Sequence, residues 1–173
     1  MAPCPTIETA RLRLRPYRIE DFEPVAELMA SDWSVHMGGP FGRSVTWAYF
    51  ASETANWALR GHGGWSVELA DGTFAGQVGI NRMAHWPEAE LGWTVWPAHQ
   101  GKGIAFEAAQ AARDWAFGPG GLSTLVSYIS PGNARSIALA TRLGAAPDPA
   151  APRPEGETPA DTVVYRHPKP EHA

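Results

Sequence analysis

The fold is decided by the stretch Glu90-Leu-Gly-Trp-Thr-Val-Trp-Pro-Ala-His-Gln-Gly-Lys-Gly-Ile-Ala-Phe-Glu-Ala108. The alternation of Leu91, Trp93 and Val95 with smaller residues predicts an extended strand, and Pro97 is expected to end it because proline has no N–H for a ladder. Beyond the glycines, apolar and small residues recur at helical spacing. A glycine-rich loop that runs into a helix presents free N–H groups and a positive dipole end to an anion. The stretch therefore predicts a phosphate site.

Two common phosphate-binding templates do not match this loop. A P-loop needs Ser or Thr directly after Gly-Lys, whereas Gly103 follows Lys102 here. The dinucleotide fingerprint needs a third glycine at the position that Phe106 occupies. The pattern that remains is Gln-x-x-Gly-x-Ala, made by Gln100, Gly103 and Ala105.

This pattern, after a strand that begins Glu-Leu-Gly, resembles the acyl-CoA pyrophosphate loop of the GNAT acetyltransferase superfamily. The residue sequence of this loop is most similar to that of the branch that contains the ribosomal-protein N-terminal acetyltransferases. A second motif agrees with it: Asn133-Ala-Arg-Ser136, followed by Leu143-Gly144. The resemblance implies an α/β (α+β) fold with a central mixed, mostly antiparallel sheet of six to seven strands, flanked by about four helices.

The periodicity and the turn residues predict further elements. The alternation in Arg11-Leu-Arg-Leu-Arg15 predicts a half-buried strand whose three arginines face solvent. The others are a helix at 19–30, a polar loop at Ser31–Ser44, a helix at Thr46–Arg60, a hairpin at Asp71-Gly72, strands at Leu122–Ile129 and Asp161–Arg166, and a helix at 131–144.

Length and composition predict one globular domain. The chain has 173 residues with 44% hydrophobic and 18% charged residues, and we expect a single N-acetyltransferase domain over 1–173, with a core at about 6–168 and an irregular Ala/Pro-rich loop at 145–160. No stretch approaches the roughly 20 apolar residues of a membrane span, and a secretory signal is not expected. Cys4 is the only cysteine, which fits a reducing cytoplasm; we expect it to be exposed.

Charge and residue types restrict the partners. A net charge of −4 argues against a nucleic-acid partner and is compatible with a cationic amine. The six histidines are scattered and no metal site is predicted. Trp33, Trp47 and Trp86 belong either to the core or to an aromatic acceptor pocket. The oligomeric state stays open, with a homodimer among the alternatives.

The resemblance implies how the cofactor is bound. The backbone N–H groups of the loop would hold the pyrophosphate of acetyl-CoA, with the Lys102 side chain exposed. Backbone N–H groups at a strand bulge would polarise the thioester carbonyl. Asn133 would bond the pantetheine arm, although it is also a good helix N-cap. The cofactor-binding residues expected on this basis are Trp93, Thr94, Val95, Gln100, Gly101, Lys102, Gly103, Ile104, Ala105 and Asn133.

Two residues are the candidates for proton transfer. Glu90 lies where many relatives have a carboxylate on the acceptor side, and we expect it to be the general base; the alternative is a solvated or salt-bridged carboxylate. His85 is the second candidate base. Many superfamily members place a tyrosine where Ala140 stands, so Ser136 is the expected acid.

These residues predict an acetyltransferase that moves acetyl from acetyl-CoA to a primary amine, on a protein N-terminus or a small molecule, in a ternary complex. The alternatives are a catalytically silent acyl-CoA-binding sensor domain and a kinase-like nucleotide binder. The expected acceptor loop at Ser31–Ser44 carries no signature that identifies the amine.

Overall fold

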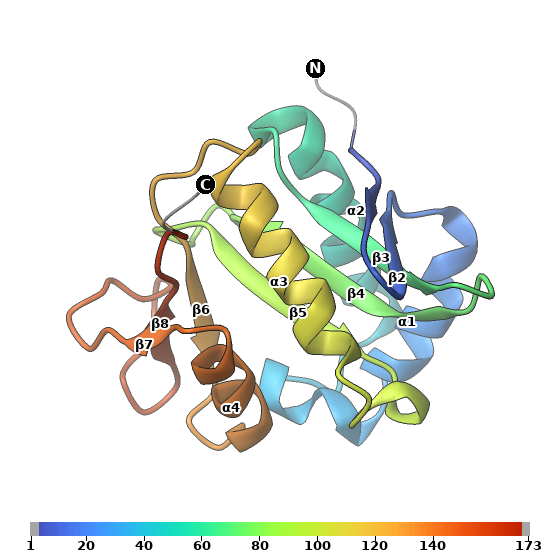
Figure 1. Cartoon of the computed structure of the whole chain (residues 1–173). Coiled ribbons are helices and arrows are strands. Elements are labelled where there is room, and N and C mark those ends of the chain that lie inside the picture. The colour runs from blue at the N-terminus through green and yellow to red at the C-terminus, as the bar shows by residue number, and fades with distance from the viewer. Residues whose placement is uncertain (1–3, 171–173) are drawn as a thin grey trace.

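The computed structural model describes residues 4–170. In this part of the chain one sheet of eight strands is accompanied by four α-helices and three short 3-10 helices (Figure 1). The helices are η1 (Ile19–Asp21), α1 (Phe22–Met29), η2 (Asp32–Met37), α2 (Arg43–Arg60), η3 (Pro97–His99), α3 (Ile104–Phe117) and α4 (Ala134–Arg142). The strands are β1 (Ile7–Glu8), β2 (Leu12–Arg15), β3 (Gly64–Leu69), β4 (Phe74–Asn81), β5 (Glu90–Val95), β6 (Val126–Ile129), β7 (Ala146–Pro147) and β8 (Val163–Arg166).

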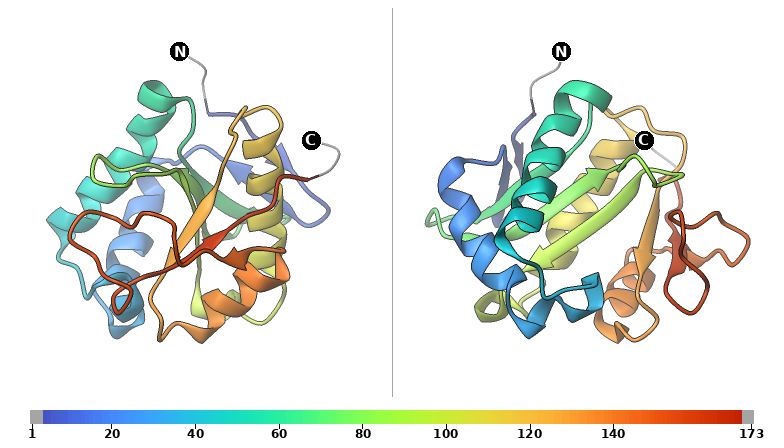
Figure 2. Two further views of the ribbon diagram at one scale, coloured as in Figure 1. Left: turned by 90° about the vertical axis from the view of Figure 1, so that its left-hand side faces the viewer. Right: turned by 180° about the vertical axis from the view of Figure 1, so that it is seen from behind.

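The sheet is mixed and has a helix layer on each face. Its strand order is β1-β2-β3-β4-β5-β6-β8-β7, and β5–β6 is the parallel pair among antiparallel neighbours. Helix α3 covers one face, and α1 and α2 cover the other (Figures 1 and 2). This arrangement confirms the predicted fold class.

Small residues let α3 approach the sheet closely. Ala109, Ala112 and Ala116 are fully buried and share a core cluster with Ile80 and Leu91. Alanine side chains leave little distance between helix and strands, so the start of α3 is held firmly against the end of β5. The loop between β5 and α3 therefore has a fixed position.

The sheet has more strands than the six to seven expected. The short strands β1 and β7 lie at its two edges. Strand β7 falls inside the loop that was expected to be irregular throughout, because Ala146 pairs with Arg166 of β8. Strand β6 is shorter than predicted and begins at Val126, since the β8 ladder ends where Val126 faces Arg166.

The prediction of a polar loop at Ser31–Ser44 was wrong in part. Ser31 caps η2 by accepting a hydrogen bond from the Trp33 N–H at 3.3 Å. Gly38 ends η2 in the left-handed region with φ 88°. Helix α2 then begins at Arg43, ahead of the predicted start.

Two predictions of exposure were also wrong. Arg15 is only 4% exposed, because its guanidinium pairs with Asp21 at 2.7 Å and with Glu68 at 2.8 Å. Cys4 is half-buried beside β3, and burial raises the pKa of its thiol to about 12. Within residues 4–170, no helix has both the length and the hydropathy needed to cross a bilayer.

Candidate functional site

Strands β5 and β6 separate after a single paired position. Glu90 pairs with Val126, and the Ser127 hydroxyl then donates to the Leu91 carbonyl at 2.6 Å. Further along, the ribbons diverge (Figure 1). The edge of β5 that faces β6, including Trp93, Thr94 and Val95, has no ladder partner there in the described residues. Apart from the Val95 carbonyl, which accepts from the Gln100 amide at 3.1 Å, the described residues leave backbone groups of this edge available to an extended molecule.

The glycine loop leads from β5 into the N-terminus of α3. Gly101 and Gly103 have positive φ values of 72° and 77°. Gly103 is the N-cap of α3 and provides no side-chain cap. Because the N–H groups of the first helical turn, at Ile104 and Ala105, need an acceptor, this end of α3 suits an anion. The geometry fits the pyrophosphate of acetyl-CoA.

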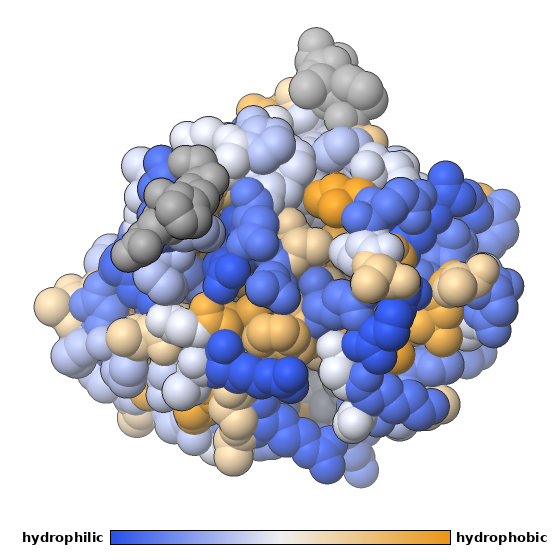
Figure 3. Space-filling view, in the orientation of Figure 1, coloured by the Kyte–Doolittle hydropathy of each residue, from blue (hydrophilic) through white to orange (hydrophobic). Residues whose placement is uncertain are grey.

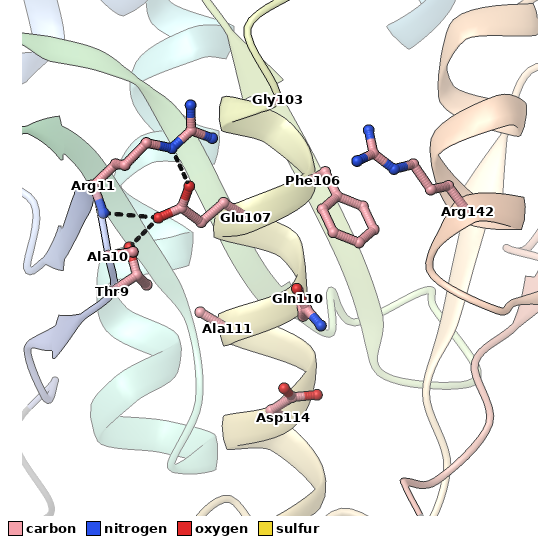
Figure 4. A pocket seen from close by; sticks show the side chains of 10 residues that line it. All are labelled: Thr9, Ala10, Arg11, Gly103, Phe106, Glu107, Gln110, Ala111, Asp114 and Arg142. Atoms are coloured by element: carbon pink, nitrogen blue, oxygen red, sulfur yellow. Dashed lines mark hydrogen bonds and ion pairs between the residues drawn. The ribbon is translucent and has the colours of Figure 1, made fainter.

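Arg11, which directly precedes β2, holds this loop in place. Its guanidinium donates to the Lys102 carbonyl at 3.0 Å and to the Glu107 carboxylate at 2.6 Å. Glu107 also accepts from the Arg11 N–H at 2.9 Å and from the Thr9 hydroxyl at 2.7 Å (Figure 4). A Cβ at Gly103 would lie 3.2 Å from an Arg11 nitrogen. Sequence reasoning missed this role, because Arg11 and Glu107 are 96 positions apart and the arginine stands in an alternating strand pattern.

An open cavity of about 430 Å³ lies beside the first turns of α3. Arg142 from α4 places its guanidinium 4.0 Å from the centre of the Phe106 ring, so two arginines flank the cavity, with Arg11 on its other side (Figure 4). Hydrophilic residues surround hydrophobic surface on this face of the molecule (Figure 3). The cavity is also lined by the carboxylates of Glu107 and Asp114. The two arginines and the Phe106 ring suit a ligand that has both an aromatic ring and phosphate groups.

Three of the predicted cofactor residues stabilise the loop and α4. The Gln100 amide donates to the Val95 carbonyl at 3.1 Å and accepts from Arg135 at 2.8 Å, so it links β5 to α4. Lys102 is exposed, as expected, and donates to the Ala98 carbonyl at 2.9 Å. Asn133 is the N-cap of α4, because its side-chain oxygen accepts from the Ser136 N–H at 3.1 Å.

Trp93 and Ser136 lie together between β5 and α4. The Trp93 indole N–H donates to the Ser136 hydroxyl at 3.3 Å. The indole also packs against two core clusters, one on the α3 side of β5 and one around Ile129 and Ala140. The expected acid therefore faces the point where β5 and β6 diverge.

The two carboxylates at the start of β5 differ sharply. Glu88 is paired with Arg166 at 2.8 Å and accepts from the Thr124 hydroxyl, and these bonds lower its pKa. Within residues 4–170 Glu90 has no ion-pair partner. Burial, followed by the negative charge of Glu53, raises the pKa of Glu90 to about 8, and a hydrogen bond from the Tyr128 backbone lowers it only in part. Of the two, Glu90 is the carboxylate that can take up a proton near neutral pH.

Other polar side chains on the Glu90 face come from distant parts of the chain. Asn81 of β4 faces Glu90 in the register. Glu53 of α2 accepts a hydrogen bond from the Tyr17 hydroxyl, and burial raises its pKa to about 7. None of these three was predicted. Each looks ordinary in its own segment, and only the strand register and the α2 packing bring them onto the same face of the sheet as Glu90.

The other sequence candidates lie apart from one another. His85 is exposed and its ring lies 6.0 Å from that of Trp86, which is itself 5.8 Å from Tyr128 of β6. Trp33 and Trp47 instead pack with α1 residues. The three tryptophans therefore do not line one pocket. The described residues hold no cluster of three metal-ligating side chains.

Comparisons with known proteins agree on one family. Residues 11–146 match the family model described as acetyltransferase (GNAT) domain. The uncharacterized protein YkkB of Bacillus subtilis (strain 168) is 33% identical over 146 residues, which are 79% of this chain and 82% of YkkB.

Solved structures that are similar to this chain are also acetyltransferases. The acetyltransferase from Agrobacterium tumefaciens str. C58 is 44% identical with a TM-score of 0.90, over 96% of each chain. RimL, a ribosomal L7/L12 alpha-N-protein acetyltransferase solved with coenzyme A, shares the fold at 18% identity and a TM-score of 0.69, over 94% of this chain and 97% of RimL. The predicted resemblance is confirmed: the chain belongs to the GNAT acetyltransferase family.

Proposed function

We propose that this chain is a single N-acetyltransferase domain that moves acetyl from acetyl-CoA to a primary amine by direct attack in a ternary complex. The observation that carries the proposal is Glu90, a carboxylate with a pKa of about 8 at the point where β5 leaves β6. Its acceptor is a small-molecule amine or a protein N-terminus.

The backbone N–H groups of residues 100–105 hold the pyrophosphate in this proposal. The positive φ of Gly103 and the absence of a side-chain cap support this role. Asn133 holds the pantetheine arm from the head of α4. Arg11 and Arg142 bind the nucleotide end of the cofactor, because both guanidinium groups border the cavity beside α3.

Proton transfer is divided between two side chains. Glu90 accepts a proton from the amine as the new C–N bond forms. Backbone N–H groups among Trp93, Thr94 and Val95 stabilise the negative charge on the carbonyl oxygen. Ser136 gives a proton to the sulfur as the C–S bond breaks, and it lies in the divergence of β5 and β6 through its bond to Trp93. Glu88 takes no part, because Arg166 keeps it paired.

The composition supports a proposal for the cellular compartment and the partners of the enzyme. The single half-buried cysteine fits a cytoplasmic enzyme, and a chain of net charge −4 fits an amine acceptor better than a nucleic acid. A homodimer is compatible with the exposed apolar side chains of α2, among them Val45 and Leu59.

A panel of amines with detection of the released thiol tests this function. The panel should contain linear amines, amino acids, aminoglycosides and short peptides with free N-termini, each with acetyl-CoA. We expect CoA release with at least one class. Acetyl-CoA binding without release on any amine would instead support the silent sensor domain. A nucleotide-binding kinase is not supported by the family comparison.

A further inference from the structure

Three neighbouring strands carry glycine at the same level of the sheet. Gly64 of β3 pairs with Gly79 of β4, which pairs with Gly92 of β5. Cross-strand partners point to the same face, so this row has no side chains of its own on the face that α1 and α2 cover. Polar side chains from other positions lie over it instead.

Each glycine of this row lies under a polar side chain. A Cβ on the first glycine would be 2.3 Å from the Tyr17 hydroxyl and 2.9 Å from a Glu53 carboxylate oxygen. A Cβ on Gly79 would be 2.7 Å from the Asn81 amide nitrogen. A Cβ on Gly92 would be 3.3 Å from a Glu90 carboxylate oxygen. Because these glycines have no Cβ, four polar side chains can lie close to the backbone of the sheet, with one carboxylate at each end of the row. We call this set, Tyr17, Glu53, Asn81 and Glu90, the acceptor layer.

The acceptor layer is rich in oxygen acceptors and holds no cation. Among residues 4–170, no Lys, Arg or His nitrogen lies within ion-pair distance of Glu53 or Glu90. Asn81 is 5% exposed, and its side-chain oxygen is buried without a hydrogen-bond partner in the described part of the chain. Buried polar atoms are normally paired, and a buried carboxylate without a cation is costly even where it accepts a hydrogen bond, as Glu53 does from Tyr17. The layer lacks N–H donors that carry positive charge.

We infer that the acceptor layer binds a linear amine with two cationic nitrogens, one held by Glu53 and Tyr17 and the other presented to Glu90. The Asn81 oxygen accepts an N–H bond from the bound amine between them. This inference rests on the proposed function and names its substrate class. Glu53 is then a specificity residue, and Glu90 remains the base.

The spacing of the layer sets the length of the amine. Two strand spacings of about 4.8 Å put the outer glycines about 10 Å apart. An oxygen of the Glu53 carboxylate lies 2.9 Å from a Cβ at Gly64, and an oxygen of the Glu90 carboxylate lies 3.3 Å from a Cβ at Gly92, so we take about 10 Å as the separation of the two carboxylates. After hydrogen bonds of about 2.8 Å at both ends, roughly 4 to 7 Å remain between the two nitrogens, which a chain of three or four carbons spans. A monoamine would neutralise only one carboxylate.

A matched pair of substrates tests the inference. Butane-1,4-diamine and butan-1-amine have the same chain, and they differ in the second nitrogen. We expect wild type to prefer the diamine through a lower KM. Glu53→Gln should raise the KM for the diamine about 10- to 100-fold, the loss expected for a hydrogen bond to a charged group. Above the pKa of Glu90, where the base is ionised in both proteins, its KM for butan-1-amine should change far less than its KM for the diamine, and its KM for acetyl-CoA should not change. Glutamine still accepts the Tyr17 hydrogen bond, so the fold should survive.

Glu27→Gln, on the exposed surface of the neighbouring α1, is the control and should behave as wild type with both amines. Equal KM values for the two amines in wild type would overturn the inference while leaving the proposed function intact. An unchanged diamine KM in Glu53→Gln would do the same. No CoA release from wild type with either amine or with the wider panel would overturn the proposed function as well.

Discussion

The cofactor loop and the acceptor layer differ in how their polar side chains are paired. Around the loop, Arg11, Glu107 and Gln100 each have at least two hydrogen-bond partners within the chain. In the acceptor layer, residues 4–170 provide no cation for Glu53 or Glu90 and no hydrogen-bond partner for the Asn81 side-chain oxygen. The comparison indicates that the chain itself shapes the cofactor end, whereas the acceptor end needs charge from its substrate.

The largest effect in this comparison should come from Gly103→Val. A side chain there meets Arg11 and blocks the approach of a phosphate to the backbone, and φ is 77°. We expect acetyl-CoA affinity to fall about 100-fold or more, roughly 3 kcal/mol, measured by calorimetry. Gly121→Val is the matched control: its φ is 65° with nothing within 4 Å, so it should lose stability but keep affinity. Unchanged affinity in Gly103→Val would refute the loop assignment.

A smaller effect should follow from Arg11→Ala. The substitution removes the hydrogen bond to the Lys102 carbonyl and a positive charge beside the loop, so acetyl-CoA should bind about tenfold more weakly, as for the loss of one charge-assisted bond. Arg13→Ala, two residues further on in β2 and, within residues 4–170, ion-paired only with Glu8 at 3.0 Å, should bind acetyl-CoA as wild type does. Equal losses in both variants would mean that general positive charge, rather than the loop contact, is responsible.

The smallest effect concerns the pH profile of kcat/KM for butan-1-amine. Glu90 must be ionised to act as base, so the rate should rise with pH through its pKa near 8. The charge of Glu53 raises that pKa, and therefore Glu53→Gln should move the rising limb to lower pH. Glu157→Gln should move it less, because Glu157 contributes less to the shift. The titration of the amine is common to all variants. If the rising limb of the Glu53→Gln profile stays at the same pH or moves to higher pH, the coupling between Glu53 and Glu90 is excluded.

The cofactor loop could be predicted from the sequence, whereas most of the acceptor layer could not. The strand, loop and helix at 90–108 were predicted correctly because glycine spacing and periodicity are local, and Glu90 was singled out with them. Tyr17, Glu53 and Asn81 were missed, because only the register of β3, β4 and β5 and the packing of α2 bring them together. The burial of Arg15 was missed for the same reason: its partner Glu68 lies on the neighbouring strand.

The central claim is that Glu90, which has no ion-pair partner in the described residues, and not Glu88, which is paired with Arg166, is the base. Turnover and acetyl-CoA affinity of Glu90→Gln and Glu88→Gln, measured side by side well below their unfolding temperatures, test it most directly. We predict that Glu90→Gln loses about 100-fold or more in kcat, the usual contribution of a general base, with unchanged acetyl-CoA affinity. Glu88→Gln should be less stable but retain turnover near that of wild type. Wild-type turnover in Glu90→Gln, or an equal loss in both variants, would contradict the claim.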